Sequence, residues 1–114
     1  MENCLFCKII AGQIPSEKVY EDENCLAFKD ISPKAPTHLL LTPKTHVAGV
    51  HLIEDGDKEI AKNLFSAVSK IVKERNLDKD GYRLVINSGE DGGQTVFHLH
   101  IHILGGKKMG WEPA

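Results

Sequence analysis

The sequence predicts a single α+β domain, residues 1–114, in which a five-stranded, mainly antiparallel sheet packs against one long helix. Three observations support this fold class. The length of 114 residues suits one domain. Short apolar or alternating stretches recur along the chain, as expected of strands. Residues 57–75 instead place apolar side chains at three- and four-residue spacing, the pattern of an amphipathic helix. Strands gathered around one long helix are typical of a two-layer α+β fold.

The remaining elements follow from the residues at their ends. A short helix is expected at residues 3–11, with Asn3 as its N-cap and Gly12 immediately after its end. Two prolines make residues 31–36 a loop, and three glycines make residues 88–93 another. The strands are expected at residues 19–21, 25–29, 38–42, 82–87 and 98–104.

Charge and composition exclude several classes of function. The net charge is −2 and the isoelectric point is near 6.3, so the chain has no general attraction to nucleic acid or to an anionic membrane. Neither a signal peptide nor an apolar stretch approaching about 20 residues is recognisable, and we expect a cytoplasmic protein. A disulfide framework is not expected there, and Cys25, inside a strand, is assigned to the core.

Three of the six histidines lie in HLHIHILGG, residues 98–106. Side chains alternate along a strand, so His98, His100 and His102 share one face, with Cα atoms about 6.7 Å apart. The aliphatic residues between them face the long helix. Three interpretations are open: solvated surface histidines, a three-histidine metal site, or a nucleophilic histidine flanked by two others.

The residues before the triad favour the nucleophilic interpretation. The glycines of loop 88–93 allow backbone N–H groups to point inward, and Gln94 and Thr95 add side-chain donors. Such donors suit a phosphoryl oxygen. A neutral imidazole can attack phosphorus and form a covalent intermediate, which divides one displacement into two.

The stretch NSGEDGGQTVFHLHIHILGG resembles the histidine triad (HIT) family, and FKDISPKAPTHLLLTPKTH, residues 28–46, is similar to the nucleotide-binding half of its Hint branch. CLFCKII and the tail with Trp111 match as well. The resemblance covers nearly the whole chain. It implies a homodimer with a continuous ten-stranded sheet, and a purine nucleoside phosphoramidase that releases a nucleoside monophosphate.

The resemblance also implies catalytic roles. His100 becomes nucleotidylated, His102 bonds phosphate oxygens and helps protonate the leaving amine, and His38 is an additional active-site histidine. Gln94 and Thr95 are expected to contact the phosphate and the leaving group, although many relatives have Ser at the position of Thr95. A histidine rather than a glutamine at position 102 favours hydrolysis over nucleotidyl transfer.

A nucleotide pocket is expected beside these residues. Asp30 is expected to accept the ribose hydroxyls, with capping of its own loop as the alternative, and Asn87 to contact ribose or phosphate. Trp111 is expected near the active site of the partner subunit, where it shapes leaving-group preference. The other expected nucleotide-binding residues are the apolar Phe6, Ile9, Phe28, Ile31 and Leu40, which suit a purine, and Gly93 of the glycine-rich loop.

The pair Cys4-x-x-Cys7 has the spacing of zinc ligands, but alone it equally suits buried thiols. Distant relatives of the family, the galactose-1-phosphate uridylyltransferases, use two cysteines, a downstream histidine and the first triad histidine. The matching residues are Cys4, Cys7, His46 and His98, which implies a structural Zn²⁺. His98 would then position its neighbours and not transfer protons. His51 is expected to be solvated.

Three rival functions remain open from the sequence. The protein could be a nucleotide-binding regulator with incidental hydrolysis, a zinc-stabilised interaction protein in which His100 has no chemical task, or a dinucleoside polyphosphate hydrolase. The sequence identifies neither the leaving group nor a preference for adenine or guanine.

Overall fold

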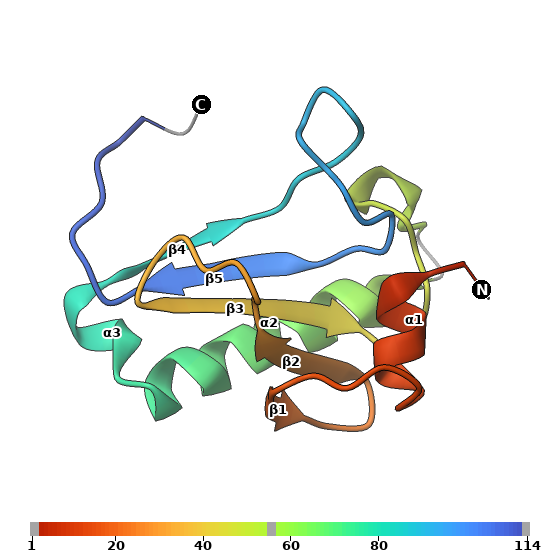
Figure 1. Ribbon diagram of the computed structural model, residues 1–114, viewed down its shortest axis with the longest axis horizontal. Helices are drawn as coiled ribbons and strands as arrows, with labels where there is room; N and C mark the ends of the chain where they lie inside the picture. Colours follow the sequence, from red (N-terminus) through yellow and green to blue (C-terminus); the bar gives the residue numbers. More distant parts are fainter. Residues whose placement is uncertain (1–2, 55–56, 113–114) are drawn as a thin grey trace.

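A computed structural model describes residues 3–54 and 57–112, and in this part of the chain five strands form one antiparallel sheet in the order β1-β2-β3-β5-β4 (Figure 1). The predicted fold class is therefore confirmed. The strands are β1 (Lys18–Glu21), β2 (Cys25–Lys29), β3 (Thr37–Pro43), β4 (Tyr82–Val85) and β5 (Ile101–Gly105). The helices are α1 (Leu5–Ile10), the 3₁₀ turn η1 (Val50–Leu52), α2 (Lys58–Glu74) and α3 (Leu77–Asp80).

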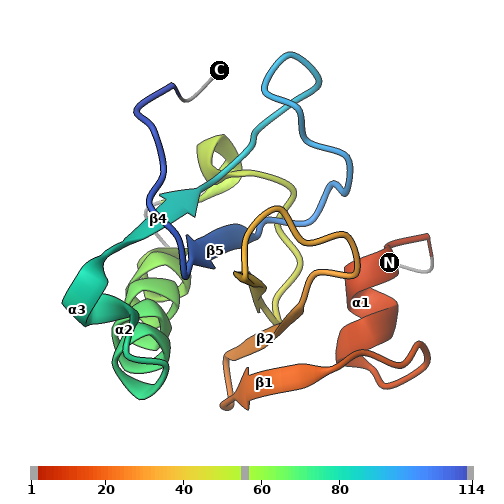
Figure 2. The same ribbon diagram turned by 60° about the vertical axis from the view of Figure 1, so that its left-hand side comes forward.

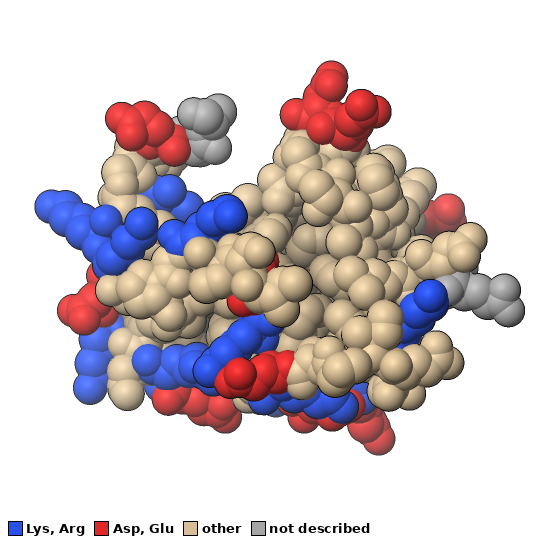
Figure 3. Space-filling model, in the orientation of Figure 1, with Lys and Arg blue, Asp and Glu red and all other residues tan. Residues whose placement is uncertain are grey.

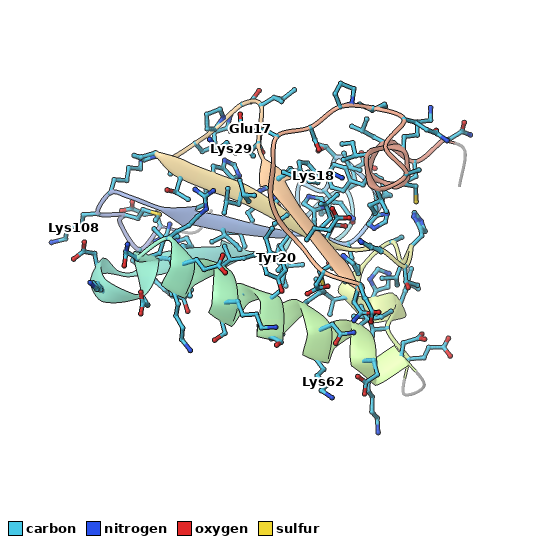
Figure 4. The ribbon with its side chains drawn as sticks, turned by 90° about the horizontal axis from the view of Figure 1, so that it is seen from below. Glu17, Lys18, Tyr20, Lys29, Lys62 and Lys108 are labelled. Atoms are coloured by element: carbon cyan, nitrogen blue, oxygen red, sulfur yellow. The ribbon has the colours of Figure 1, made fainter. Side chains whose placement is uncertain are left out.

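Helix α2 covers one face of the sheet (Figure 2). Its buried stripe, which includes Leu64, Val68 and Ile71, packs on residues from the central strands, such as Leu41. Lys62 points away from the sheet (Figure 4). Fully burying one aliphatic side chain contributes about 1.5–3 kcal/mol, and Ile71→Ala is expected to cost about 2–5 kcal/mol. No helix in the described ranges is both long and apolar enough to cross a bilayer.

Helix α1 covers part of the opposite face. Phe6 and Ile9 pack against Leu26, Phe28 and Leu40, and the rest of this face carries the histidines. Because α2 and α1 cover opposite faces of the sheet, four consecutive residues of β2, Cys25–Phe28, are buried and exposed residues do not alternate with buried ones. Cys25 is a core residue, as predicted, and its burial raises the pKa of its thiol to about 11.

The ends of α1 correct one prediction. Gly12 follows the helix with φ of +78°, in the left-handed region that glycine adopts readily. The N-cap, however, is Cys4 and not Asn3, because the Cys7 N–H donates to Cys4 Sγ at 3.3 Å. The residue that caps this helix is thus one of the expected metal ligands.

Strand β5 begins at Ile101, three residues later than predicted, and Pro43 of β3 explains the difference. Proline has no N–H to donate to the sheet, so the ladder ends there. Beyond this point, side-chain hydrogen bonds replace the backbone ladder between the two segments. Thr42 Oγ1 donates to the Leu99 carbonyl at 2.9 Å, and His98 Nε2 contacts the Pro43 carbonyl at 2.8 Å. Strand β4 also ends earlier than predicted, at Val85. The short elements η1 and α3 were not predicted, because three or four residues give no periodic signal.

Candidate functional site

The histidines lie on the sheet face that α2 does not cover. His102 pairs with Leu40 of β3 and with Val85 of β4, and Leu40 pairs with Phe28 of β2. His100 continues the same face beyond the end of the strand, with its ring centroid 5.0 Å from that of His102. The aliphatic residues between the histidines lie in the core against α2, as alternation predicts. Five residues of chain therefore provide both a core surface and a polar site.

His100 presents a free Nε2. Its Nδ1 lies 2.7 Å from the His98 carbonyl oxygen, which can only accept, so the proton of the neutral ring is on Nδ1 and Nε2 keeps its lone pair. The ring is 6% exposed and meets Phe6 edge to face at 4.9 Å. Burial lowers its pKa, because the interior disfavours the charged form. A neutral imidazole with an unshared Nε2 lone pair is a nucleophile.

His102 and His38 form a hydrogen-bonded pair across β3 and β5. His38 Nε2 lies 2.9 Å from His102 Nδ1 and 3.4 Å from Asp30 Oδ2, and the Lys34 N–H donates to His38 Nδ1 at 3.0 Å. Burial, and then the nearby His100 and His38, lower the pKa of His102 to about 4. Burial also lowers the pKa of His38. Both rings are neutral at pH 7.

An apolar pocket of about 560 Å³ opens beside His100 and His102, a size that suits a small-molecule ligand. Asp30 and Thr95 also line it. Its apolar walls contain the expected base-pocket residues Phe6, Ile9, Phe28, Ile31 and Leu40. Ile31 is 98% exposed, so it forms a rim and not a wall. At the edge of the pocket, Glu17 and Lys29 form an ion pair at 2.6 Å (Figure 4).

A second hollow of about 400 Å³ adjoins the first, and Asp30, His102 and Thr95 line both. Asn87 and His38 line only the second. Asp30 caps its own loop, which was one of the two roles expected for it: Oδ1 accepts the Ser32 N–H at 2.7 Å, while Oδ2 lies near His38 at 3.4 Å. Its contact with ribose hydroxyls stays a prediction. One carboxylate oxygen is thus fixed by the loop and the other is directed into the site.

Gln94 is not placed as the sequence suggested. It is 6% exposed and lines neither hollow. Its Nε2 donates to the carbonyls of Ala48 and Val96, and its Oε1 accepts the Gly89 N–H at 2.8 Å. All three partners are backbone groups. The side chain therefore holds the glycine-rich loop, and its amide has no free donor for a phosphate.

The glycine-rich loop is tightly folded. A Cβ at Gly92 would lie 2.4 Å from the Ser88 carbonyl oxygen, so only glycine fits there. Asn87 Nδ2 donates to the Gly92 carbonyl at 2.8 Å, and Gly93 has φ of +80°. The loop stands out from the molecule as a lobe with acidic residues at its tip (Figure 3). Gly93 shapes this loop and lines neither hollow.

Trp111 lies apart from these hollows within the single chain. It is 86% exposed and lines neither of them. The segment after β5 runs past β4 and away from α1 (Figure 1). A role for Trp111 in the site of the same chain has no support in this geometry. Its expected role at the site of a partner stays a prediction.

A second cluster joins α1 to the triad. Cys4 Sγ, Cys7 Sγ, His46 Nδ1 and His98 Nδ1 all lie within 4.8 Å of one another. Cys4 Sγ lies 3.4 Å from His98 Nδ1, and Cys7 Sγ lies 3.4 Å from His46 Nδ1 and 3.5 Å from His98 Nδ1. The two Nδ1 atoms are 3.1 Å apart. A tetrahedral zinc site has edges of about 3.5 Å between S and N and about 3.3 Å between two N atoms. The four residues therefore fit a tetrahedral metal ion.

The orientation of His98 supports the same conclusion. The ring is fully buried, and its Nε2–H donates to the Pro43 carbonyl at 2.8 Å, which leaves the Nδ1 lone pair directed at the two sulfurs. Sequence reasoning missed this carbonyl and also the Lys34 N–H that holds His38. Both are backbone groups, so residue type gave no signal for either.

Comparisons with known proteins agree with this geometry. The chain matches the HIT domain over residues 11–109. A HIT family hydrolase from Legionella pneumophila is 49% identical, with a TM-score of 0.95 over 98% of this chain and 100% of that chain. A 14 kDa zinc-binding protein from Zea mays is 47% identical, covering 96% of this chain and 87% of that protein. A histidine triad nucleotide-binding protein from Candida albicans is 36% identical, with a TM-score of 0.83 over 98% of this chain and 84% of that chain.

Proposed function

The chain belongs to the histidine triad (HIT) family, and on this basis we propose that it hydrolyses purine nucleoside 5′-phosphoramidates and releases a nucleoside monophosphate such as AMP or GMP. One observation carries the proposal: the buried, neutral His100 directs its free Nε2 toward an apolar pocket of nucleotide size. The names of the relatives from Legionella pneumophila and Candida albicans, a hydrolase and a nucleotide-binding protein, support the same class of activity.

The reaction proceeds in two displacements. His100 Nε2 attacks phosphorus, the P–N bond to the leaving amine breaks, and a nucleotidyl-histidine forms. Water then attacks phosphorus and gives a proton back to His102, the bond to His100 breaks, and the nucleoside monophosphate leaves. The bond from His100 Nδ1–H to the His98 carbonyl stabilises the positive charge that develops on the ring during attack.

His102 supplies the proton for the leaving amine. Its pKa of about 4 in the free protein keeps it neutral, so it does not repel the attacking ring. A bound phosphate accepts the Nε2–H of the neutral ring, and its negative charge raises the pKa of His102, so that a proton is available at this nitrogen for the leaving amine. Thr95 borders both hollows, so its hydroxyl is available to the phosphate or to the leaving group.

The purine occupies the apolar pocket and the ribose lies over Asp30. The rings of Phe6 and Phe28, whose centroids are 5.4 Å apart, offer aromatic surfaces to the base. A purine base between apolar walls is removed from water, which favours binding. Asp30 Oδ2 is directed into the site and accepts ribose hydroxyls. Asn87 lines the adjoining hollow, within reach of ribose or phosphate.

We also propose that the Cys4, Cys7, His46 and His98 cluster holds a structural Zn²⁺. The tetrahedral distances, the donor set of two sulfurs and two nitrogens, and the name of the Zea mays relative support this metal. The ion would tie α1, which carries Phe6 and Ile9 of the base pocket, to the segment that carries His100. When bound, zinc supplies structural stability and no chemistry at phosphorus.

A homodimer with a ten-stranded sheet completes the proposal. Strand β4 lies at an edge of the sheet, and it has no strand partner on its outer side in the described part of the chain. Tyr82, Ile86 and Phe65 are large apolar residues that the single chain leaves exposed. Pairing of two β4 edges would join the sheets and bring the tail with Trp111 toward the partner's site. Light scattering of the purified protein tests the oligomeric state.

The experiment that tests the function is hydrolysis of adenosine 5′-phosphoramidate by wild type, His100→Ala and the matched control His51→Ala. His51 is an exposed histidine outside both hollows. We expect AMP release by wild type and His51→Ala, and a loss of several orders of magnitude in His100→Ala. Equal, slow rates with retained AMP binding would instead support a nucleotide-binding regulator. Turnover of diadenosine polyphosphate but not of the phosphoramidate would support the function of a polyphosphate hydrolase. The absence of both hydrolysis and nucleotide binding would support an interaction protein.

A further inference from the structure

The Nε2 atom of His38 lies near two hydrogen-bond acceptors, His102 Nδ1 and Asp30 Oδ2, and its single proton can be donated to only one of them at a time. The ring is 7% exposed and sits on β3 beside His102 of β5. Because the Lys34 backbone N–H donates to Nδ1 at 3.0 Å, Nδ1 keeps its lone pair and the proton of the neutral ring is on Nε2. That Nε2–H donates to His102 Nδ1 at 2.9 Å, and Nε2 also lies 3.4 Å from Asp30 Oδ2, a longer contact that a small turn of the ring could convert into a hydrogen bond.

The choice between these acceptors decides where His102 carries its own proton. When His38 Nε2–H donates to His102 Nδ1, that nitrogen must be unprotonated, and the proton of neutral His102 is held on Nε2. When His38 Nε2–H turns to Asp30, His102 Nδ1 loses its donor, and its proton is free to occupy either nitrogen. The Asp30 carboxylate thus competes with His102 for one hydrogen bond.

The two oxygens of Asp30 are not equivalent. Oδ1 accepts the Ser32 N–H at 2.7 Å, so the loop fixes the carboxylate in place. Oδ2 faces His38, and the side chain is 18% exposed where it borders both hollows. A ligand in the site can therefore reach the same oxygen that competes for the His38 proton.

We propose that Asp30 couples ribose recognition to the tautomer of His102, with His38 as the positioning residue between them. Ribose hydroxyls that donate to Asp30 Oδ2 occupy its lone pairs, and His38 Nε2–H is left to His102 Nδ1. His102 then carries its proton on Nε2. The alternative Nδ1–H tautomer is excluded, because Nδ1 accepts the hydrogen bond from His38. This inference rests on the proposed function, because it takes a nucleotide as the ligand.

The charged and titratable groups around the pair are consistent with this coupling. His102 faces His100 from its own segment, His38 from β3 and Asp30 from the loop after β2, while Lys34 lies near His38. Burial, and then His100 and His38, lower the pKa of His102, while burial and the nearby Lys34 lower the pKa of His38. The negative charge of Asp30 raises both pKa values. A ligand on Asp30 therefore acts on both rings at once.

The direct test is ¹⁵N NMR of the full-length protein labelled at histidine, because imidazole nitrogen shifts distinguish the two tautomers. The probes are AMP and 2′,3′-dideoxy-AMP, which share base and phosphate but differ in the ribose hydroxyls. At saturation, we expect AMP to place His102 in a single Nε2–H form, and the dideoxy nucleotide to leave the mixture of the free protein. In Asp30→Ala the two nucleotides should give the same spectrum. Identical His102 tautomers with both nucleotides on wild type would overturn the proposal.

A kinetic measurement separates this inference from the proposed function. Single-turnover hydrolysis of the adenosine and 2′,3′-dideoxyadenosine phosphoramidates at saturation reports the chemical step without the difference in binding. We expect the ribonucleotide to react about tenfold faster, a difference of about 1.4 kcal/mol in barrier, and the ratio to approach one in Asp30→Ala. Equal wild-type rates that still depend on His100 would refute the coupling and leave the function standing. No hydrolysis of either substrate would refute the function, while the NMR result would still decide the coupling.

Discussion

His98 and His100 lie two residues apart on one face of one segment, yet they offer opposite ring nitrogens to their surroundings. His98 donates Nε2–H to the Pro43 carbonyl and directs Nδ1 at Cys4 and Cys7. His100 donates Nδ1–H to the His98 carbonyl and leaves Nε2 free beside the apolar pocket. In each case a backbone carbonyl fixes the proton and so decides which lone pair is free.

The comparison teaches how one repeated residue type can serve two kinds of site. The proposed metal centre needs a lone pair beside the sulfurs, and the proposed catalytic site needs one beside phosphorus. A proline that ends the β3 ladder provides the carbonyl for His98, and the backbone of His98 itself provides the carbonyl for His100. We therefore expect a substitution at His100 to lower activity with little effect on stability, and substitutions at Cys4 and Cys7 to lower mainly stability.

The largest expected effect is that of His100→Ala on catalysis. Removing the nucleophile should lower kcat/KM for adenosine phosphoramidate by about 10⁴-fold or more, or about 5 kcal/mol in barrier, because the variant loses the nitrogen to which the proposal assigns the attack on phosphorus. Zinc content, measured by atomic absorption, and the unfolding temperature should stay close to wild type. Loss of zinc in this variant would contradict the separation of the two sites.

The reverse experiment removes the metal centre. Cys4→Ser combined with Cys7→Ser should lower zinc content to near zero and the unfolding temperature by on the order of 10 °C, since a structural ion at 100 times its dissociation constant contributes about 2.7 kcal/mol. Activity should fall by about 10- to 100-fold, because the proposed ion would position His98 and thereby His100. Calorimetry with and without added zinc measures the effect. An unchanged unfolding temperature would remove the structural role.

Gln94→Ala should have an intermediate effect that is independent of both histidines. The variant loses three hydrogen bonds that hold the glycine-rich loop, and it leaves buried carbonyls without a donor. We expect a loss of about 2–3 kcal/mol in the free energy of unfolding and about a tenfold loss of activity. Urea denaturation provides the first value. If Gln94 instead contacts the phosphate, activity would fall far more than stability, and KM for the nucleotide would rise.

The smallest expected effect is the dependence of stability on pH. The pKa of His102 is about 4 in the folded protein and 6.5 in the unfolded chain, so the unfolded state binds more protons between these values. The free energy of unfolding therefore falls as pH drops from about 6.5 to about 4. His102→Gln should lose part of this dependence, and urea midpoints at pH 7.5 and 5.0 for both proteins measure it. Equal falls in the two proteins would assign the effect to other groups.

Local pattern predicted most of the fold. The spacing of Leu64, Val68 and Ile71 placed α2 to within a residue at each end, because a long amphipathic helix repeats its signal several times. The start of β5 was wrong, because it depends on which strand pairs with it and on Pro43, which is distant in sequence. The cap of α1 was wrong because sulfur is a weak acceptor that cap preferences do not rank highly.

The site was predictable where it depends on residue type and not where it depends on backbone groups. Alternation placed the three histidines on one face, and the resemblance brought Cys4, Cys7, His46 and His98 together, as the structure does. The bracing role of Gln94 and the tautomers of the histidines depend on carbonyl and N–H groups. Those groups are the same in almost every residue, so only the folded chain identifies them.

The most direct test of the central claim is to locate the covalent intermediate. Wild type would be mixed with adenosine phosphoramidate and quenched in alkali during turnover, where a phosphorus–nitrogen bond to imidazole survives, and peptides would then be sequenced by mass spectrometry. The opposite tautomers of the two histidines predict one adenylyl group on His100 and none on His98. An adduct on His98 or His102, or turnover without any adduct, would contradict the assignment of His100 Nε2 as the nucleophile.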